Sequence, residues 1–356
     1  MDAIAGIHEA NRNLPSELIV IPIGLAEQDG PKNLHVTLNP GGTSVLELGP
    51  AWSNRYKHSF GTDFDFPEST EVIEDRPIEA RSLDSLLTSM KDDLPPPDFL
   101  SLDTQGSEYE ILLGAREAIV RQTCGLIVEV EFVELYQGQK RYQEICDILY
   151  GLGFAFVRFV SIGEQSGYRG PLGFRAAGYQ TFAEALFLRR PECIDPAADT
   201  ALRVYKNLCF VAIVFDLTEL AVECFERLKK IKSPDAIFEA PRYEYEKFLA
   251  ELFDVYQRSN RILPPAFSQV LPRARLKQLS VYAPYQWPRI LSGLCNIDDS
   301  YLSQVGTIQL AHETEFEAVL KRYDFVKLAE FVGSERRDQA HKIRAAIELA
   351  RMARGS

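Results

Sequence analysis

Apolar positions in the first half of the chain gather into short runs, each followed by a polar turn and often by a helical pattern. The runs with the length and branched or aromatic character of strands cover residues 18–21, 71–81, 99–102, 126–132, 154–160 and 185–189. Helical patterns follow Asp84, follow Ser107 and cover residues 142–152. This alternation predicts an α/β fold with a Rossmann-like, doubly wound and mostly parallel sheet, whose last two strands form an antiparallel edge.

Three local signals refine these elements. Asp84 stands at an N-cap position, and Ser107 with Glu110 has the spacing of a capping box. Asp29-Gly30 is a hairpin signal, with a returning strand expected over residues 33–38.

The pattern changes from Pro196 onward. Residues 201–230 and 243–256 are amphipathic helix candidates, and 313–352 is a further helical region. We therefore expect an α/β domain over residues 1–195 and a mainly α-helical C-terminal region over 196–356.

Composition narrows the function classes. The chain has 356 residues, 46% of them hydrophobic, and a net charge of −12, which argues against a nucleic-acid partner. Neither the scattered cysteines nor the isolated histidines have metal-ligand spacing, and the cysteines are expected to be reduced thiols. Residues 1–15 lack a secretory signal and no apolar run is long enough for a membrane span, so we expect a cytoplasmic protein of open oligomeric state.

The strand over 99–102 runs directly into the polar turn Asp103-Thr104-Gln105-Gly106. In open α/β sheets, chemistry lies where parallel strands end. Asp103 is therefore a candidate base for a substrate hydroxyl or a ligand for a divalent metal, and its alternative is a cap of the turn. Gln105 and Glu108 share the turn and are candidate pocket residues, although a carboxylate in the first helical turn also explains Glu108.

The next strand carries two carboxylates, Glu129 and Glu131, which point to the same face because they are two residues apart. Burying such a pair is costly without partners. Close carboxylates raise one another's pKa and suit a general base or a metal site. Glu131, nearer the strand end, is the likelier pocket residue of the two.

Residues 98–115 resemble the signature of the FkbM family of S-adenosylmethionine-dependent methyltransferases. The family pattern is Asp-Phe-(Leu/Ile)-Lys-(Leu/Ile)-Asp, then (Val/Thr)-Gln-Gly-(Ala/Ser)-Glu. Here Ser101 replaces the lysine, and Tyr109 stands where a leucine is usual. Further blocks resemble the family in order over residues 21–30, 40–46, 129–139 and 185–189, so the resemblance covers about residues 2–190.

The resemblance implies a class I methyltransferase that moves a methyl group from S-adenosylmethionine to a hydroxyl of a sugar or related metabolite. It implies catalytic roles for Asp103 and Glu131. It implies substrate-binding roles for Gln105, Glu108, Tyr136, Gln139 and Ser44, and cofactor-binding roles for Asp2, Gly24, Leu25 and Ala26. Asp2 would hold the ribose, and Gly24–Ala26 would lie beside the adenine.

Some of these residues have simpler readings. Tyr136 and Gln139 would otherwise pack at a helix entry, Ser44 would form a turn, and Gly24–Ala26 would be an ordinary passage from strand to turn. A divalent metal stays open but has no support in the ligand spacing.

One departure from the family concerns the N-terminus, where no Gly-rich turn follows a first strand. Met1-Asp2-Ala3 matches the end of the family's second strand, so the first strand or strands are missing from this sequence. We expect the protein to start upstream of Met1, the alternative being a true truncation. The rival function is a non-catalytic methyltransferase-like remnant that acts as a scaffold through its helical C-terminal region.

Overall fold

The computed structural model describes residues 19–50, 58–59, 70–166, 178–215, 217–259, 318–319 and 322–323. The chain divides into two compact units, Met1–Ser233 with Glu330–Ser356 and Pro234–Ala329. Asp2 lies outside the described residues, as does most of the helical region expected over 313–352. Each unit is described by itself.

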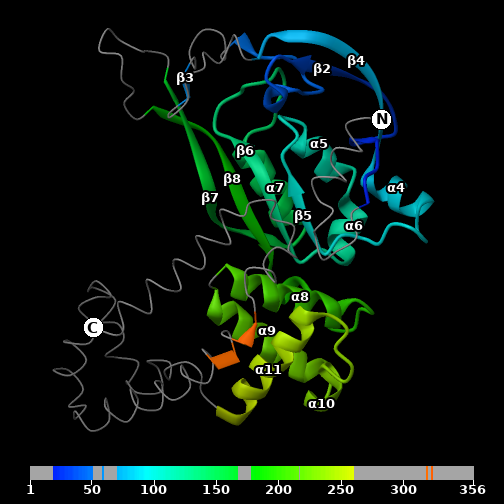
Figure 1. Cartoon of the computed structure of the whole chain (residues 1–356), viewed down its shortest axis with the longest axis vertical. Helices are drawn as coiled ribbons and strands as arrows, with labels where there is room; N and C mark the ends of the chain where they lie inside the picture. Colours follow the sequence, from blue (N-terminus) through cyan, green and yellow to red (C-terminus); the bar gives the residue numbers. More distant parts are fainter. Residues whose placement is uncertain are drawn as a thin grey trace, which may run out of the picture. The chain divides into compact units, whose positions relative to one another are not determined.

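A five-stranded sheet forms the centre of the first unit (Figure 1). Its strands, in spatial order, are β3 (His58–Ser59), β7 (Phe154–Ser166), β8 (Tyr179–Arg189), β6 (Gly125–Glu131) and β5 (Phe99–Leu102). β5 and β6 are parallel, with Phe99 opposite Gly125, and the other neighbours are antiparallel. The predicted α/β class and the antiparallel pairing of the last two long strands are confirmed. The expected mostly parallel sheet with these two strands at its edge is wrong for the described strands, because β5–β6 is the parallel pair of this sheet and β8 lies between β6 and β7.

Three helices cover one face of this sheet: α5 (Glu108–Leu113), α6 (Arg116–Arg121) and α7 (Tyr142–Gly151) (Figure 1). Their apolar side chains form one buried cluster with Leu126, Val128 and Val130 of β6. Because side chains alternate along a strand, Glu129 and Glu131 point to the opposite face. The helical pattern after Ser107 is interrupted at Gly114, where a Cβ would clash with the carbonyl oxygen of Ala26.

A second sheet has the order β1 (Gly24–Leu25), β4 (Val72–Arg81) and β2 (Gly30–Thr37). The predicted hairpin at Asp29-Gly30 is wrong, because β1 and β2 lie on opposite sides of β4 rather than beside each other. The strand expected over 18–21 is also wrong where it is described, since residues 19–21 have no strand pairing and Ile19 is exposed.

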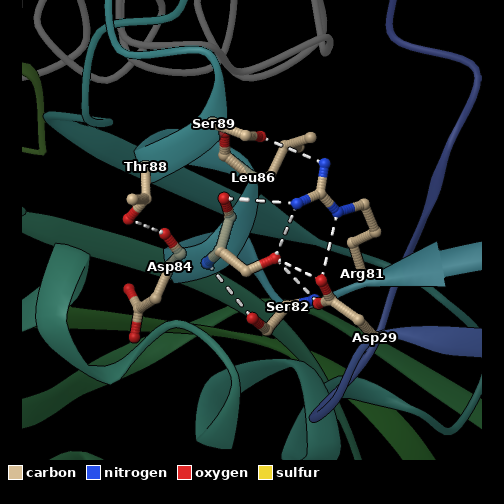
Figure 2. Close-up of polar contacts among 8 residues, drawn as sticks. Asp29, Arg81, Ser82, Asp84, Leu86, Thr88 and Ser89 are labelled. Atoms are coloured by element: carbon tan, nitrogen blue, oxygen red, sulfur yellow. Dashed lines mark hydrogen bonds and ion pairs between the residues drawn. The ribbon is translucent and has the colours of Figure 1, made fainter.

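The turn between β1 and β2 is tied to helix α4 (Leu83–Ser89) by the Asp29 carboxylate (Figure 2). Asp29 accepts hydrogen bonds from the Ser82 backbone N–H (2.9 Å) and the Ser85 hydroxyl (2.7 Å), and it pairs with Arg81 (3.2 Å). These hydrogen bonds, that of Ser85 first, lower the pKa of Asp29. The network fixes the start of α4 against the second sheet.

The capping predictions need correction. Ser82, rather than Asp84, is the N-cap of α4 and accepts from the Ser85 N–H (3.2 Å). Asp84 instead caps α6, because its carboxylate accepts from the backbone N–H groups of Glu117 and Ala118 (both 2.9 Å). Ser107 makes no capping hydrogen bond, and its hydroxyl donates to Thr104.

Two helices, α8 (Ala201–Val214) and α9 (Thr218–Ile231), belong to the first unit. Tyr205 of α8 donates to the Pro191 carbonyl (2.9 Å), and Arg158 of β7 donates to the Phe215 carbonyl (2.7 Å). The described helices of the second unit are α10 (Pro234–Ile237) and α11 (Glu244–Ser259). The domain boundary near residue 196 stays a prediction. No helix in the described part of the chain has both the length and the apolar character needed to cross a membrane.

Candidate functional site

The turn after β5 has an unusual backbone that the Glu108 carboxylate holds in place. Gln105 has a φ of 57°, which no other non-glycine residue among those described approaches, and Gly106 follows with a φ of 107°. The buried Glu108 carboxylate accepts from the Thr104 backbone N–H (2.6 Å), the Thr104 hydroxyl (2.9 Å) and the Gly106 N–H (3.0 Å). Glu108 therefore organises the turn from inside.

The Gln105 side chain joins the turn to β6. Its amide nitrogen Nε2 donates to Oδ1 of the exposed Asp103 (2.8 Å) and to Oε2 of Glu129 (2.7 Å). Its amide oxygen Oε1 accepts from the Tyr136 hydroxyl (3.0 Å). The amide thus brings together the predicted Asp103 and a carboxyl group of the neighbouring strand.

Glu129 and Glu131 lie near the end of β6, where burial disfavours their charged forms. Their residues are 9% and 2% exposed. Burial, followed by repulsion from Asp103, raises the pKa of Glu129 well above its ordinary value. Burial, followed by repulsion from Glu108, raises the pKa of Glu131 to about 9. Burial therefore favours the protonated form of both carboxyl groups.

The segment after β6 closes one side of this cluster. Gln139 Oε1 accepts from the backbone N–H groups of Leu135 (3.0 Å) and Tyr136 (3.2 Å). The Gln139 side chain lowers the pKa of Glu131, which offsets part of the rise caused by burial. The buried Nε2 of Gln139 makes no hydrogen bond of regular geometry with a described residue. Burial raises the pKa of Tyr136, so its phenol stays protonated.

Ser44 reaches the same turn from an earlier segment. Its hydroxyl donates to the Gln105 carbonyl (2.6 Å) and accepts from the Leu46 N–H (3.0 Å). The structure therefore brings together seven of the residues expected from the sequence. They are Ser44, Asp103, Gln105, Glu108, Glu131, Tyr136 and Gln139.

The described candidates for the cofactor lie elsewhere. Gly24 and Leu25 form β1, and Ala26 packs beside Gly114, at the opposite end of α5 from Glu108. The Ala26 N–H donates to the Arg81 carbonyl (3.0 Å), and Ile78 Cδ1 lies 3.0 Å from the position of a Cβ on Gly24. The backbone here pairs with β4, and the cofactor-binding role expected of Gly24, Leu25 and Ala26 stays a prediction.

The carboxyl cluster has the chemistry to face a cation. Asp103, Glu108, Glu129 and Glu131 lie near one another, and among the described residues none of them forms an ion pair with Lys, Arg or His. No group of three or more His, Cys, Asp or Glu in the described part of the chain is arranged to hold a metal ion.

Sequence reasoning missed two parts of the cluster. Glu184 of β8 is buried and lies directly opposite Glu129 in the strand register, so both side chains share one face. Its signal was a single carboxylate within the apolar run Phe182–Leu188. The Gly42 carbonyl is the longer of two acceptors for the single Tyr136 hydroxyl proton (3.3 Å, against 3.0 Å for Gln105 Oε1), and it had no signal because any residue supplies a carbonyl.

Comparison with known proteins gives a domain match within the α/β part. No curated protein and no solved structure matches the chain. The family model described as the methyltransferase FkbM domain matches residues 6–156, which include the turn and both β6 carboxylates. This match confirms the resemblance to the FkbM methyltransferase domain drawn from the sequence, over residues 6–156.

Proposed function

We propose that this protein is an S-adenosylmethionine-dependent methyltransferase that methylates an oxygen nucleophile of a sugar or a related hydroxylated small molecule. The observation that carries the proposal is the position of Asp103. It immediately follows β5, at the same end of the parallel β5–β6 pair as Glu129 and Glu131, in a chain with an FkbM domain. Parallel strands that end at a polar cluster also support a Rossmann-like sheet.

In this proposal Asp103 accepts the proton of the substrate hydroxyl. Gln105 holds Oδ1 of Asp103, so Oδ2 is the oxygen that faces the hydroxyl. S-adenosylmethionine supplies an electrophilic methyl group. The chain's own contribution is to orient the hydroxyl and to remove its proton.

Glu129 and Glu131 act in their protonated forms as neighbours of Asp103. Burial raises the pKa values of Glu129 and Glu131, and the exposed Asp103 is the carboxyl group of the cluster that we propose takes the proton. We also propose that the cationic sulfonium lies near the Asp103 carboxylate, because opposite charges attract and Asp103 is exposed at the end of β5. Polyhydroxylated acceptors suit the cluster since hydroxyl groups donate to carboxyl oxygens.

The first test is a calorimetric titration of the chain with S-adenosylmethionine. It is followed by transfer of a labelled methyl group to a panel of sugars and other hydroxylated small molecules. We expect binding, and methylation of at least one acceptor. Absence of cofactor binding would favour the rival reading of a non-catalytic scaffold.

The second test is Asp103→Asn, with Asp92→Asn as the matched control because Asp92 is exposed and follows α4. We expect Asp103→Asn to keep affinity for S-adenosylmethionine and to lower turnover on the order of a hundredfold or more. The control should transfer methyl groups at the wild-type rate. Unchanged turnover in Asp103→Asn would reject its role as the base.

A further inference from the structure

Gln105 occupies a backbone conformation that glycine adopts readily and that side chains rarely adopt. Such a conformation persists in a folded protein only where surrounding contacts enforce it. Here the Ser44 hydroxyl holds the Gln105 carbonyl (2.6 Å), and Glu108 holds the N–H groups on both sides, those of Thr104 and Gly106. These contacts therefore hold the main chain at Gln105 independently of its side chain.

The amide of Gln105 uses its hydrogen-bonding groups within the protein. Its Nε2 has two protons, and these go to Asp103 (2.8 Å) and Glu129 (2.7 Å). Its Oε1 accepts from the Tyr136 hydroxyl (3.0 Å), which sets which end of the amide faces the carboxyls. A rotated amide would place Oε1 against two carboxyl groups and lose both donations.

We propose that Gln105 is a positioning residue, whose amide clamps the Asp103 and Glu129 carboxyl groups together and whose orientation is locked by Tyr136. The clamp sets the geometry of the carboxyl pair, and substrate contacts come from Asp103 itself. This inference deepens the proposed function and rests on it only for the identity of Asp103 as the base.

Several titratable groups face Glu129. Asp103 and Glu108 approach from the turn and α5, Glu131 from the same strand, and Tyr136 from the segment after β6. Glu184 lies opposite Glu129 on β8. Because an amide N–H stabilises the ionised form of a carboxyl group, removing the clamp should raise the titration midpoint of Glu129.

The experiment follows the side-chain carboxyl carbons of Asp103 and Glu129 by NMR across a pH titration of the full chain with labelled Asp and Glu. The variants are Gln105→Gly, which suits the positive φ, and Tyr136→Phe, which keeps the ring and removes the hydroxyl. The control is Gln137→Ala, an exposed glutamine whose amide contacts Glu47 and Leu48 instead.

We expect Gln105→Gly to raise the Glu129 midpoint by about one pH unit, Tyr136→Phe to raise it by a smaller amount, and Gln137→Ala to leave it unchanged. Wild-type midpoints in both Gln105→Gly and Tyr136→Phe would overturn the clamp. If Gln105→Gly does not fold, the side-chain amide protons of Gln105 still decide the question. Slow exchange in the wild type that is lost in Tyr136→Phe supports the clamp, and equal exchange in both contradicts it.

A parallel titration with S-adenosylmethionine separates the two proposals. If the variants leave the carboxyl midpoints at wild-type values while the wild type binds S-adenosylmethionine, the clamp is rejected and the proposed function stands. If the variants shift the midpoints as expected but the wild type does not bind S-adenosylmethionine, the proposed function is rejected and the clamp stands.

Discussion

Glu131 is a carboxyl group whose protonation state depends on the fold. It is 2% exposed, and burial raises its pKa to about 9. The folded protein therefore binds a proton at Glu131 in a pH range where the unfolded chain, with an ordinary glutamate pKa near 4.5, has released it. Stability must fall as pH rises through this window, because ionisation favours the unfolded state.

We expect Glu131→Gln to unfold at a higher temperature than the wild type at pH 8 and to show little advantage at pH 5. The wild type should lose up to about 1.4 kcal/mol of stability per pH unit from this one group within the window. Thermal melts followed by circular dichroism between pH 5 and pH 9 measure the difference. The exposed Glu79→Gln on β4 is the control, and it should follow the wild-type curve. A pH-independent difference for Glu131→Gln would contradict burial as the cause.

At the same scale, the sequence predicted which residues meet but not how they are used. Asp103 and Glu131 were predicted from their positions at strand ends, and the structure places both in the cluster. The hydrogen bonds of Gln105 could not be predicted, because they depend on a positive φ that no sequence rule assigns to glutamine. The contacts of Ser44 and Tyr136 with Gln105 could not be predicted either, because they depend on the same backbone conformation.

At the scale of elements, helices in this protein are stabilised by residues outside them. α6 has Ala115 at its N-cap, a residue without a capping side chain, and Asp84 supplies the missing acceptor from α4. Asp84 was correctly predicted to cap a helix, but the helix that it caps is α6 rather than α4. Local spacing cannot show that α4 and α6 lie side by side, because only the tertiary fold brings them together.

We expect Asp84→Ala to lower the free energy of unfolding by about 1 kcal/mol, the usual cost of a lost N-cap, since two N–H groups of α6 lose their acceptor. Urea unfolding followed by circular dichroism measures this change. Asp92→Ala removes the same charge from an exposed position just after α4 and should cost less than about 0.5 kcal/mol. Equal losses for the two variants would show that charge, rather than capping, is the cause.

The strands were predicted well where long apolar runs are buried and poorly where pairing is not local. β5, β6 and β7 begin within a residue of their predicted starts, and all seven residues of β6 are buried. The hairpin at Asp29-Gly30 failed because β4, more than thirty residues later, lies between the two flanking strands. The Asp-Gly sequence predicts that the chain reverses direction, but it does not determine which strand β1 and β2 pair with.

At the scale of the whole chain, α8 and α9 behave as part of the sheet unit. Tyr205 of α8 is 1% exposed and donates to Pro191 immediately after β8, and Thr200 donates to the Arg121 carbonyl at the end of α6 (2.8 Å). Arg203 pairs with Asp98 just before β5. These contacts predict that the helix pair and the sheet unfold in a single transition.

We expect Tyr205→Phe to lower the free energy of unfolding by about 1–3 kcal/mol, because the Pro191 carbonyl loses a buried donor. Far-UV circular dichroism and amide hydrogen exchange in β6 and α8 should report the same loss. Tyr150→Phe is the control, since Tyr150 is 61% exposed and keeps its ring stacked on Arg190. If α8 exchanges faster while β6 is unaffected, the helix pair is a separate folding unit.

The position of β8 inside the sheet has a consequence for synthesis on the ribosome. β6 and β7 are translated before β8 and are not neighbours of each other; β6 pairs with β5 on one side, and β8, which ends at Arg189, joins β6 to β7. Until that segment leaves the exit tunnel, a nascent chain carries two apolar strands without the partner that joins them. The carboxyl-bearing strand β6 thus completes its environment late in translation, and until then it presents an unpaired edge to chaperones and to other nascent chains.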